Sequence, residues 1–329
     1  MAFSADIIQR ARRELEAKKA DRESVYRQHL QQAYAQVPRL REIDLTQRSN
    51  MAKAAQAAFT QGGDAQAAME QVKQENLSLQ SEYEKLVAEN FSPGFLDNSP
   101  VCAHCGGNGY IGSAMCRCLE QLCREEQRQQ IANLTSGTER FSTFRLEYYS
   151  DRIDRNYGAS PRVIMEKTLT SCKQYAETFC QGVGNLMFTG GTGLGKTFLS
   201  ACIANEVTDR GYSVAYESAP HLFAKLEKNR FNPDEESRRQ AAKFTDCDLL
   251  IVDDLGTEMP GNFVTAALYS LLNDRLLAGK SMVVSTNLNA GELAQRYSPQ
   301  IASRLQGSFK GLTFVGEDIR IMKGRGASF

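Results

Sequence analysis

The sequence has no excess of charge of either sign, since 39 lysine and arginine residues balance 39 aspartate and glutamate residues. A protein coated uniformly with basic charge for nucleic-acid binding is therefore excluded, although a local basic patch is not. No apolar run approaches the roughly 18 residues that a membrane-spanning helix needs. The first residues, MAFSADIIQRARRELEAKK, are too charged for a secretory signal and contain the acidic residues that transit peptides avoid. We expect a soluble cytoplasmic protein that has no membrane partner.

The 329 residues leave room for about two domains. Nine cysteines fit a cytoplasmic location if they are thiols or metal ligands rather than disulfides. Five of them lie between Cys102 and Cys123, and the others stand among apolar neighbours, which is typical of small core residues.

The first hundred residues predict three helices. The first covers residues 5–37, and Pro38 should kink it or begin a second helix that runs to Phe59. Residues 60–64 (TQGGD) predict a turn in which Asp64 caps the third helix. Residues 91–100, with two prolines and one glycine, predict a linker.

The third helix has an apolar seam with one polar residue and a spacing of three and four. Its members are Met69, Val72, Asn76, Leu79, Tyr83 and Leu86. Such a seam is typical of a helix that packs along a partner helix, and an antiparallel hairpin folded on itself explains it equally well. We interpret this segment as a coiled-coil-like arm that binds another protein.

A cysteine cluster follows the linker, with the spacing C-x₂-C-x₁₀-C-x-C. The four residues are Cys102, Cys105, Cys116 and Cys118. Two thiolate pairs joined by a glycine-rich turn can close tetrahedrally on one Zn²⁺, and four sulfur ligands indicate a structural site. His104 and Cys123 are spare ligands. The alternative is a redox-active or merely clustered set of cysteines, since C-x-C is a less usual half-site.

A phosphate-binding loop is predicted after the apolar strand at residues 186–188. Gly190, Gly195, Lys196 and Thr197 satisfy G-x-x-x-x-G-K-[ST], and a helical segment follows at 198–207. The glycines allow loop amides to converge on phosphate oxygens, Lys196 neutralises the β- and γ-phosphates, and Thr197 binds Mg²⁺. The residues expected around the nucleotide are Gly190, Gly191, Thr192, Gly193, Leu194, Gly195, Lys196, Thr197 and Phe198.

A second buried strand, residues 249–252, ends at Asp253 and Asp254. Carboxylates at this end of a parallel strand lie where ligands bind in open α/β sheets. We expect Asp253 to hold Mg²⁺ through water beside Thr197, and Asp254 to orient the attacking water.

A third strand, residues 282–286, ends at Asn287, which can sense the γ-phosphate or simply start a turn. Arg304 lies on a later helix and either reaches a γ-phosphate across a subunit boundary or is an ordinary surface arginine. The aromatic side chains of residues 139–151 pack on the core, wall an adenine pocket, or do both.

The motifs GGTGLGKT, LLIVDDLGTE, STN and IASRL, in this order, resemble those of the AAA+ ATPases of the bacterial replicative-helicase loader group, the DnaC/DnaI type. The transposition helper IstB is a close relative of that group. The resemblance covers about residues 141–323. It implies Lys196 and Thr197 as Walker A, Asp253 and Asp254 as Walker B, and Asn287 as sensor 1. It also implies Arg304 as arginine finger and Arg320 as a second nucleotide-sensing arginine.

The implied fold is an α/β AAA+ P-loop NTPase core with a parallel five-stranded sheet flanked by helices. Residues 1–92 would form the helical arm, 93–135 a small zinc-binding module with a linker helix, and 136–329 the ATPase domain. The cysteine cluster also looks like the zinc-bearing region of DnaI-type loaders. Only about 25 residues follow Arg304, which is too few for a full lid domain, so a neighbouring subunit is expected to complete the nucleotide site.

The implied function is ATP-dependent loading of a DnaB-type replicative helicase onto single-stranded DNA during replication initiation or restart. Loader subunits would assemble in an arc or spiral and release the helicase on hydrolysis, which should be slow because Asp254 replaces the glutamate of most AAA+ proteins. The alternatives are an IstB-like transposase helper and a nucleotide-gated adaptor that hydrolyses little ATP. Basic residues that either contact DNA or form a solvated helix face are Lys225, Lys228, Arg230, Arg238, Arg239 and Lys243.

Overall fold

The computed structural model describes residues 3–59, 65–135 and 137–324. The turn predicted at residues 60–64, with Asp64 as a cap, lies outside these ranges. The chain forms two compact units, one of Arg13–Cys116 and one of Met1–Arg12 with Arg117–Phe329. The three-part division at residues 1–92, 93–135 and 136–329 stays a prediction. No helix in the described ranges is both long and apolar enough to cross a membrane.

The smaller unit is helical and ends in a short hairpin. Its elements are most of α1 (Ala5–Gln36), α2 (Pro38–Phe59), α3 (Ala65–Asn90), β1 (Tyr110–Ile111) and β2 (Ala114–Met115). The second helix begins at Pro38, where a missing backbone N–H costs nothing.

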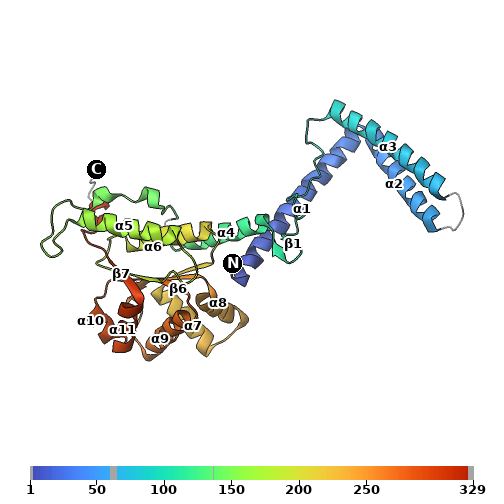
Figure 1. Ribbon diagram of the computed structural model, residues 1–329. Coiled ribbons are helices and arrows are strands. Elements are labelled where there is room, and N and C mark those ends of the chain that lie inside the picture. The colour runs from blue at the N-terminus through green and yellow to red at the C-terminus, as the bar shows by residue number, and fades with distance from the viewer. Residues whose placement is uncertain (1–2, 60–64, 136, 325–329) are drawn as a thin grey trace. The chain divides into compact units, whose positions relative to one another are not determined.

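Helices α2 and α3 pack as an antiparallel hairpin (Figure 1). Arg39 near the start of α2 donates to Glu82 near the end of α3 at 2.8 Å. Further along, Asn50 Nδ2 donates to Asn76 Oδ1 at 3.3 Å, so the polar residue of the α3 seam has an internal partner. Of the two arrangements that the seam allowed, this chain adopts the self-packed hairpin.

The larger unit contains a parallel five-stranded sheet in the order β4-β5-β6-β3-β7, which confirms the predicted fold class. Its strands are β3 (Asn185–Thr189), β4 (Val214–Ser218), β5 (Leu249–Leu255), β6 (Ser281–Thr286) and β7 (Phe309–Thr313). The helices are α4 (Arg117–Ala132), α5 (Pro161–Glu177), α6 (Lys196–Asp209), α7 (Ala219–Phe231), α8 (Glu235–Asp246), α9 (Asn262–Leu277), α10 (Ala290–Arg296), α11 (Pro299–Ser308) and α12 (Ile319–Gly324). Two short 3₁₀ turns, η1 (Phe141–Thr143) and η2 (Leu146–Tyr148), precede the sheet.

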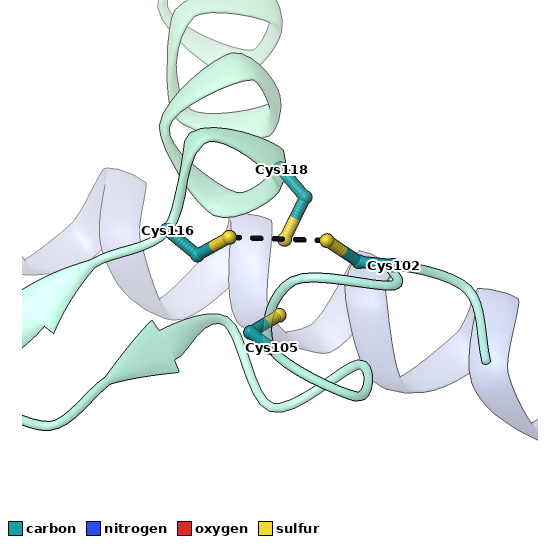
Figure 2. Close-up of side chains that lie close together, drawn as sticks. All are labelled: Cys102, Cys105, Cys116 and Cys118. Atoms are coloured by element: carbon teal, nitrogen blue, oxygen red, sulfur yellow. Dashed lines mark hydrogen bonds between the residues drawn. The ribbon is translucent and has the colours of Figure 1, made fainter.

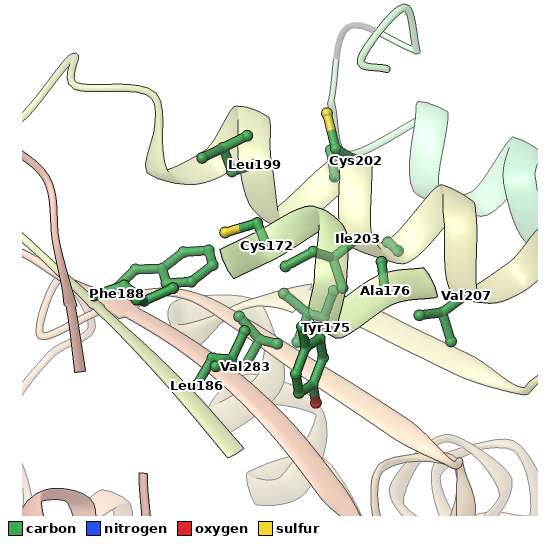
Figure 3. Packing of buried hydrophobic residues seen from close by; sticks show 14 of the residues in the cluster. Cys172, Tyr175, Ala176, Leu186, Phe188, Leu199, Cys202, Ile203, Val207 and Val283 are labelled. Atoms are coloured by element: carbon green, nitrogen blue, oxygen red, sulfur yellow. The ribbon is translucent and has the colours of Figure 1, made fainter. Parts of the chain in front are cut away.

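Both faces of the sheet are covered by helices (Figure 1). Successive β5 residues point to opposite faces, so Ile251 joins the core beneath α5 and α6 while Leu250 joins the core against α7, α9 and α11. Figure 3 shows the first core, in which Leu186 and Val283 of adjacent strands meet Ile203 of α6. Burial on both faces explains the continuous apolar runs that predicted β3, β5 and β6.

Helix α4 is fixed to α6 and to the edge strand by one glutamine. Gln127 is 1% exposed, and its Nε2 donates to Thr208 Oγ1 at 2.7 Å and to Tyr212 O at 2.9 Å. Its Oε1 accepts from the backbone N–H of Val214, the first residue of β4. This buried amide therefore satisfies polar groups of the sheet edge that would otherwise need water.

Candidate nucleotide-binding site

The phosphate-binding loop, residues 190–195, joins β3 to α6. Gly190 has φ +141°, and a Cβ there would lie 2.3 Å from the carbonyl oxygen of Phe314. Gly195 has φ +90°, and its Cβ would lie 2.9 Å from the hydroxyl of Tyr149, which itself donates to Leu194 O. The two ends of the loop thus require glycine both for their backbone conformation and for close neighbours.

The first helical residue after the loop is Lys196, so the amide end of the 14-residue helix α6 faces the loop. The first amides of a helix have no intrahelical acceptor, and they carry the positive end of the helix dipole. Together with the loop amides they form an anion-binding end.

Lys196 is nearly buried beside this helix end. Its Nζ donates to the carbonyl oxygens of Gly190 at 2.8 Å and Gly191 at 2.6 Å, and to Asn287 Oδ1 at 2.6 Å. Burial lowers the pKa of Lys196, while the nearby carboxylates of Asp254 and Asp253 act in the opposite direction. The structure thus brings the predicted loop lysine and the predicted sensor into direct contact.

Asp253, at the end of β5, is held by neutral donors from the strands on both sides. Tyr216 of β4 donates its hydroxyl to Asp253 Oδ2 at 2.9 Å, and Ser285 of β6 donates to Oδ1. Burial, with the Asp253 charge, raises the pKa of Tyr216, so the phenol stays a donor. Hydrogen bonds of this kind fix a carboxylate that ligates a metal or its waters.

Asp254 has φ +55°, in the left-handed region that aspartate tolerates better than most residues. Its N–H donates to Ser285 Oγ at 2.9 Å, and its carbonyl accepts from the Thr257 hydroxyl at 2.8 Å. Burial and the neighbouring Asp253 charge raise the pKa of the Asp254 carboxyl. A partly buried carboxylate with a raised pKa suits an acceptor of a proton from water.

Lys196, Asp254 and Asn287 line a cavity of about 710 Å³, which is within the range of small-molecule sites, while Asp253 is not among the described lining residues. Its lining combines the loop, the ends of β5 and β6, and aromatic residues of the segment before the sheet. The lining residues are Glu139, Thr143, Phe144, Arg145, Tyr148, Tyr149, Thr192, Gly193, Leu194, Gly195, Lys196, Thr197, Phe198, Asp254, Thr257, Asn287, Ile319 and Arg320.

Residues 113–304 match the family model described as "IstB-like ATP binding protein", which is more than half of the chain. The chain belongs to the IstB-like ATP-binding protein family. This family assignment agrees with a phosphate loop at the carboxyl edge of a parallel sheet.

Proteins named as replicative helicase loaders are similar to the chain over most of its length. It is 21% identical over 228 residues to "Replicative helicase loader DnaC" of Escherichia coli (strain K12), covering 69% of this chain and 88% of the relative. It is 22% identical over 245 residues to the protein of the same name from Buchnera aphidicola subsp. Schizaphis graminum, covering 72% and 92%. These matches confirm the resemblance to loaders of the DnaC/DnaI type.

Two solved structures are similar to part of the chain. The "Crystal structure of the DnaC helicase loader" has a TM-score of 0.44 and 18% identity, and covers 53% of this chain and 98% of that one. The "Crystal Structure of the DnaI" has a TM-score of 0.44 and 20% identity, and covers 58% and 92%.

The two predicted arginines lie in different places. Arg320, in α12, lines the cavity. Arg304, in α11, is not among the described residues that line it, and its guanidinium contacts Asn273 and Tyr269 of α9 instead. The role of each arginine stays a prediction.

The four predicted cysteines lie together, with every pair of sulfur atoms within 4.8 Å (Figure 2). Cys102 Sγ and Cys116 Sγ are 3.8 Å apart. Tetrahedral Zn–S bonds of about 2.3 Å place sulfurs about 3.8 Å apart, so this spacing fits a zinc site and is far too long for a disulfide. The N–H of Gly109 also donates to Cys105 Sγ at 3.2 Å, which stabilises a thiolate. Among the described residues, neither spare ligand joins the cluster.

Most of the predicted basic patch is already paired. Lys225 contacts the buried Glu217, Lys228 lies 3.0 Å from Asp234, and Arg239 contacts two glutamates of its own helix. Lys243 donates to Gln130 Oε1 at 2.6 Å. These pairs favour the solvated-face interpretation for four of the six residues.

Several residues of the site were not predicted from the sequence. Tyr216 and Ser285 lie inside strands, and only the pairing of β4 and β6 with β5 brings them to Asp253. Thr257 follows the two aspartates, but its bond to Asp254 depends on the left-handed turn. Phe144 and Tyr148 both line the cavity and pack against the core, which confirms the core packing of the aromatic segment. That these residues wall an adenine pocket stays a prediction.

Proposed function

We propose that this chain is an ATP-dependent loader that places a DnaB-type replicative helicase on single-stranded DNA in the cytoplasm. The observation that carries this proposal is the match to a replicative helicase loader over 88% of that relative's length. The cavity beside the phosphate-binding loop also fits a nucleoside triphosphate. A transposase helper shares that site but has no need of an N-terminal arm of three helices.

The proposed chemistry is slow ATP hydrolysis. Lys196 and the amides of α6 bind the phosphates, Thr197 and Asp253 hold Mg²⁺, and Asp254 orients the attacking water. Mg²⁺ would neutralise charge that develops on the phosphate oxygens. Asp254 is one methylene shorter than glutamate, so its carboxylate reaches less far towards a water on the γ-phosphate.

Arg304 would act on the ATP of a neighbouring copy, within an arc or spiral of subunits, since it lies away from its own cavity. Asn287, fixed by Lys196, would report the γ-phosphate. Arg320 would contact the nucleotide of its own chain. Hydrolysis would then weaken subunit contacts and release the helicase.

The helical hairpin is the proposed helicase-binding surface. Leu45 on α2 and Leu77 on α3 are each 56% exposed, although both helices have already buried their facing sides against one another. Exposed leucines on a packed hairpin favour a further apolar partner. The four-cysteine cluster would hold structural Zn²⁺, and exposed basic residues of α7 and α8 would contact DNA phosphates.

The test is co-purification of the full chain with the replicative helicase of its host, with and without ATP, followed by helicase loading on a single-stranded DNA circle. We expect binding to be lost in Leu45→Glu and Leu77→Glu, and retained in Ser81→Glu, an exposed polar control on α3. Absence of any helicase binding contradicts the loader proposal. Loading without measurable hydrolysis indicates the adaptor instead.

A further inference from the structure

In the part of the chain that the structure describes, the Arg304 side chain of α11 is held by uncharged groups of α9. Its Nε donates to Asn273 Oδ1 at 2.5 Å, and its Nη2 donates to the Tyr269 hydroxyl at 3.2 Å. Its Cζ also lies 4.6 Å from the centroid of the Tyr269 ring, which is within the range of a cation–π contact.

Two other arginines, Arg296 and Arg275, have partners of a different kind. Arg296, at the end of α10, donates to the buried carboxylate of Glu258 at 3.2 Å. Arg275, on α9, is fully buried and donates to backbone carbonyls, including those of Phe244 and Ser281. The first is neutralised by an acid and the second is enclosed, so neither can meet an anion from outside the chain.

The uncharged partners have two consequences for Arg304. A carboxylate would cancel its charge and would have to be displaced before a phosphate could bind. An amide oxygen and an aromatic ring fix the guanidinium and leave its full charge for an incoming anion. A guanidinium fixed in advance loses less side-chain entropy when the anion arrives.

We propose that Tyr269 and Asn273 are positioning residues that hold Arg304 for the γ-phosphate of ATP bound to a second copy of this chain. This inference rests on the proposed role of Arg304, and it assigns to α9 a part in the neighbouring subunit's hydrolysis. The α9 residues act through Arg304 and do not touch the nucleotide.

The test is a mixture of two full-length variants. The acceptor carries Arg304→Ala and supplies bound ATP, and the donor carries Asp254→Asn and supplies only its Arg304. Neither variant alone is expected to hydrolyse ATP, and mixing them should recover turnover at the interfaces where donor meets acceptor. The α9 substitutions are then added to one partner at a time.

Asn273→Ala or Tyr269→Leu in the donor should lower the recovered kcat by about tenfold, with the KM for ATP unchanged. The same substitutions in the acceptor should leave the recovered kcat within about twofold of its value without them. Tyr269→Phe keeps the ring and should retain most of the recovery. Ser270→Ala, on the same helix, is the control and should have no effect. Thermal unfolding of each variant verifies that α11 remains folded.

The positioning role is overturned if the α9 substitutions lower the recovered kcat equally in the donor and in the acceptor. It is also overturned if kcat recovers fully with Asn273→Ala and with Tyr269→Leu in the donor. Either result leaves Arg304 as the finger. If the mixture of Arg304→Ala and Asp254→Asn recovers no turnover before any α9 substitution is added, the finger role itself is wrong. The positioning role is then wrong with it. The two failures are therefore distinguishable.

Discussion

The ammonium of Lys196 donates to Oδ1 of Asn287 across 2.6 Å, which links the phosphate loop to the end of β6. Because this bond uses the amide oxygen, the Nδ2 group of Asn287 points its two donors elsewhere. An amide oriented in this way can donate to a phosphate oxygen beside the lysine. The contact thus sets the orientation of the predicted sensor as well as that of the lysine.

Replacing Asn287 by aspartate should weaken ATP binding by about tenfold or more, because a carboxylate 2.6 Å from Lys196 neutralises the lysine and repels phosphate. Isothermal titration calorimetry measures the change. Asn289→Asp is the matched control, since Asn289 caps α10 by accepting from Glu292 N and aspartate caps equally well. Unchanged affinity in Asn287→Asp would show that the contact does not form in solution.

Removing the metal should change the number of reactive thiols from one to five. In zinc-loaded protein only Cys180 is both exposed and outside the cluster, so one maleimide should react rapidly. Chelation should release the four cluster thiols. Cys123, with a pKa raised by burial to about 11, and Cys202, raised to about 12, should remain unmodified near pH 7. Mass spectrometry counts the adducts, and five adducts before chelation would contradict the zinc site.

Tyr216→Phe should weaken Mg²⁺-dependent ATP binding by about tenfold, because Asp253 loses the donor that fixes its Oδ2. The ring remains, so the core of β4 stays packed. ATP affinity measured in EDTA is the internal control and should match that of the unchanged protein. An equal loss with and without Mg²⁺ would instead indicate general damage to the site.

The sequence predicted those parts of the site that have fixed spacing along the chain. The glycine loop, Lys196 and the Asp253–Asp254 pair each follow a buried strand, so local pattern and sheet topology locate them together. Tyr216 belongs to no such local pattern, because it reaches Asp253 only when β4 pairs with β5 in one register. That α2 is the partner of the α3 seam is likewise seen only in contacts between residues far apart in the sequence, such as Arg39 with Glu82.

Arg275→Ala should lower the free energy of unfolding by about 4 kcal/mol, since it leaves buried carbonyls of residues 244, 247 and 281 without a donor. Arg275→Lys should recover part of this loss, because an ammonium cannot reach all of the carbonyls at once. Urea unfolding gives both values. Arg239→Ala, at an exposed arginine, should leave the stability nearly unchanged. A small effect at Arg275 would mean that water replaces the guanidinium.

Asp254→Asn should retain ATP binding and stability and lose turnover. Asparagine tolerates the left-handed backbone at φ +55°, so the turn to Thr257 is kept, but an amide cannot accept a proton from water. Asp254→Ala should also lower stability, because alanine is strained in this conformation. In the unchanged protein, turnover should fall as the pH drops through the pKa of Asp254, which lies above the ordinary aspartate value because of burial and the Asp253 charge. Turnover that persists in Asp254→Asn would assign the orientation of the water to another residue.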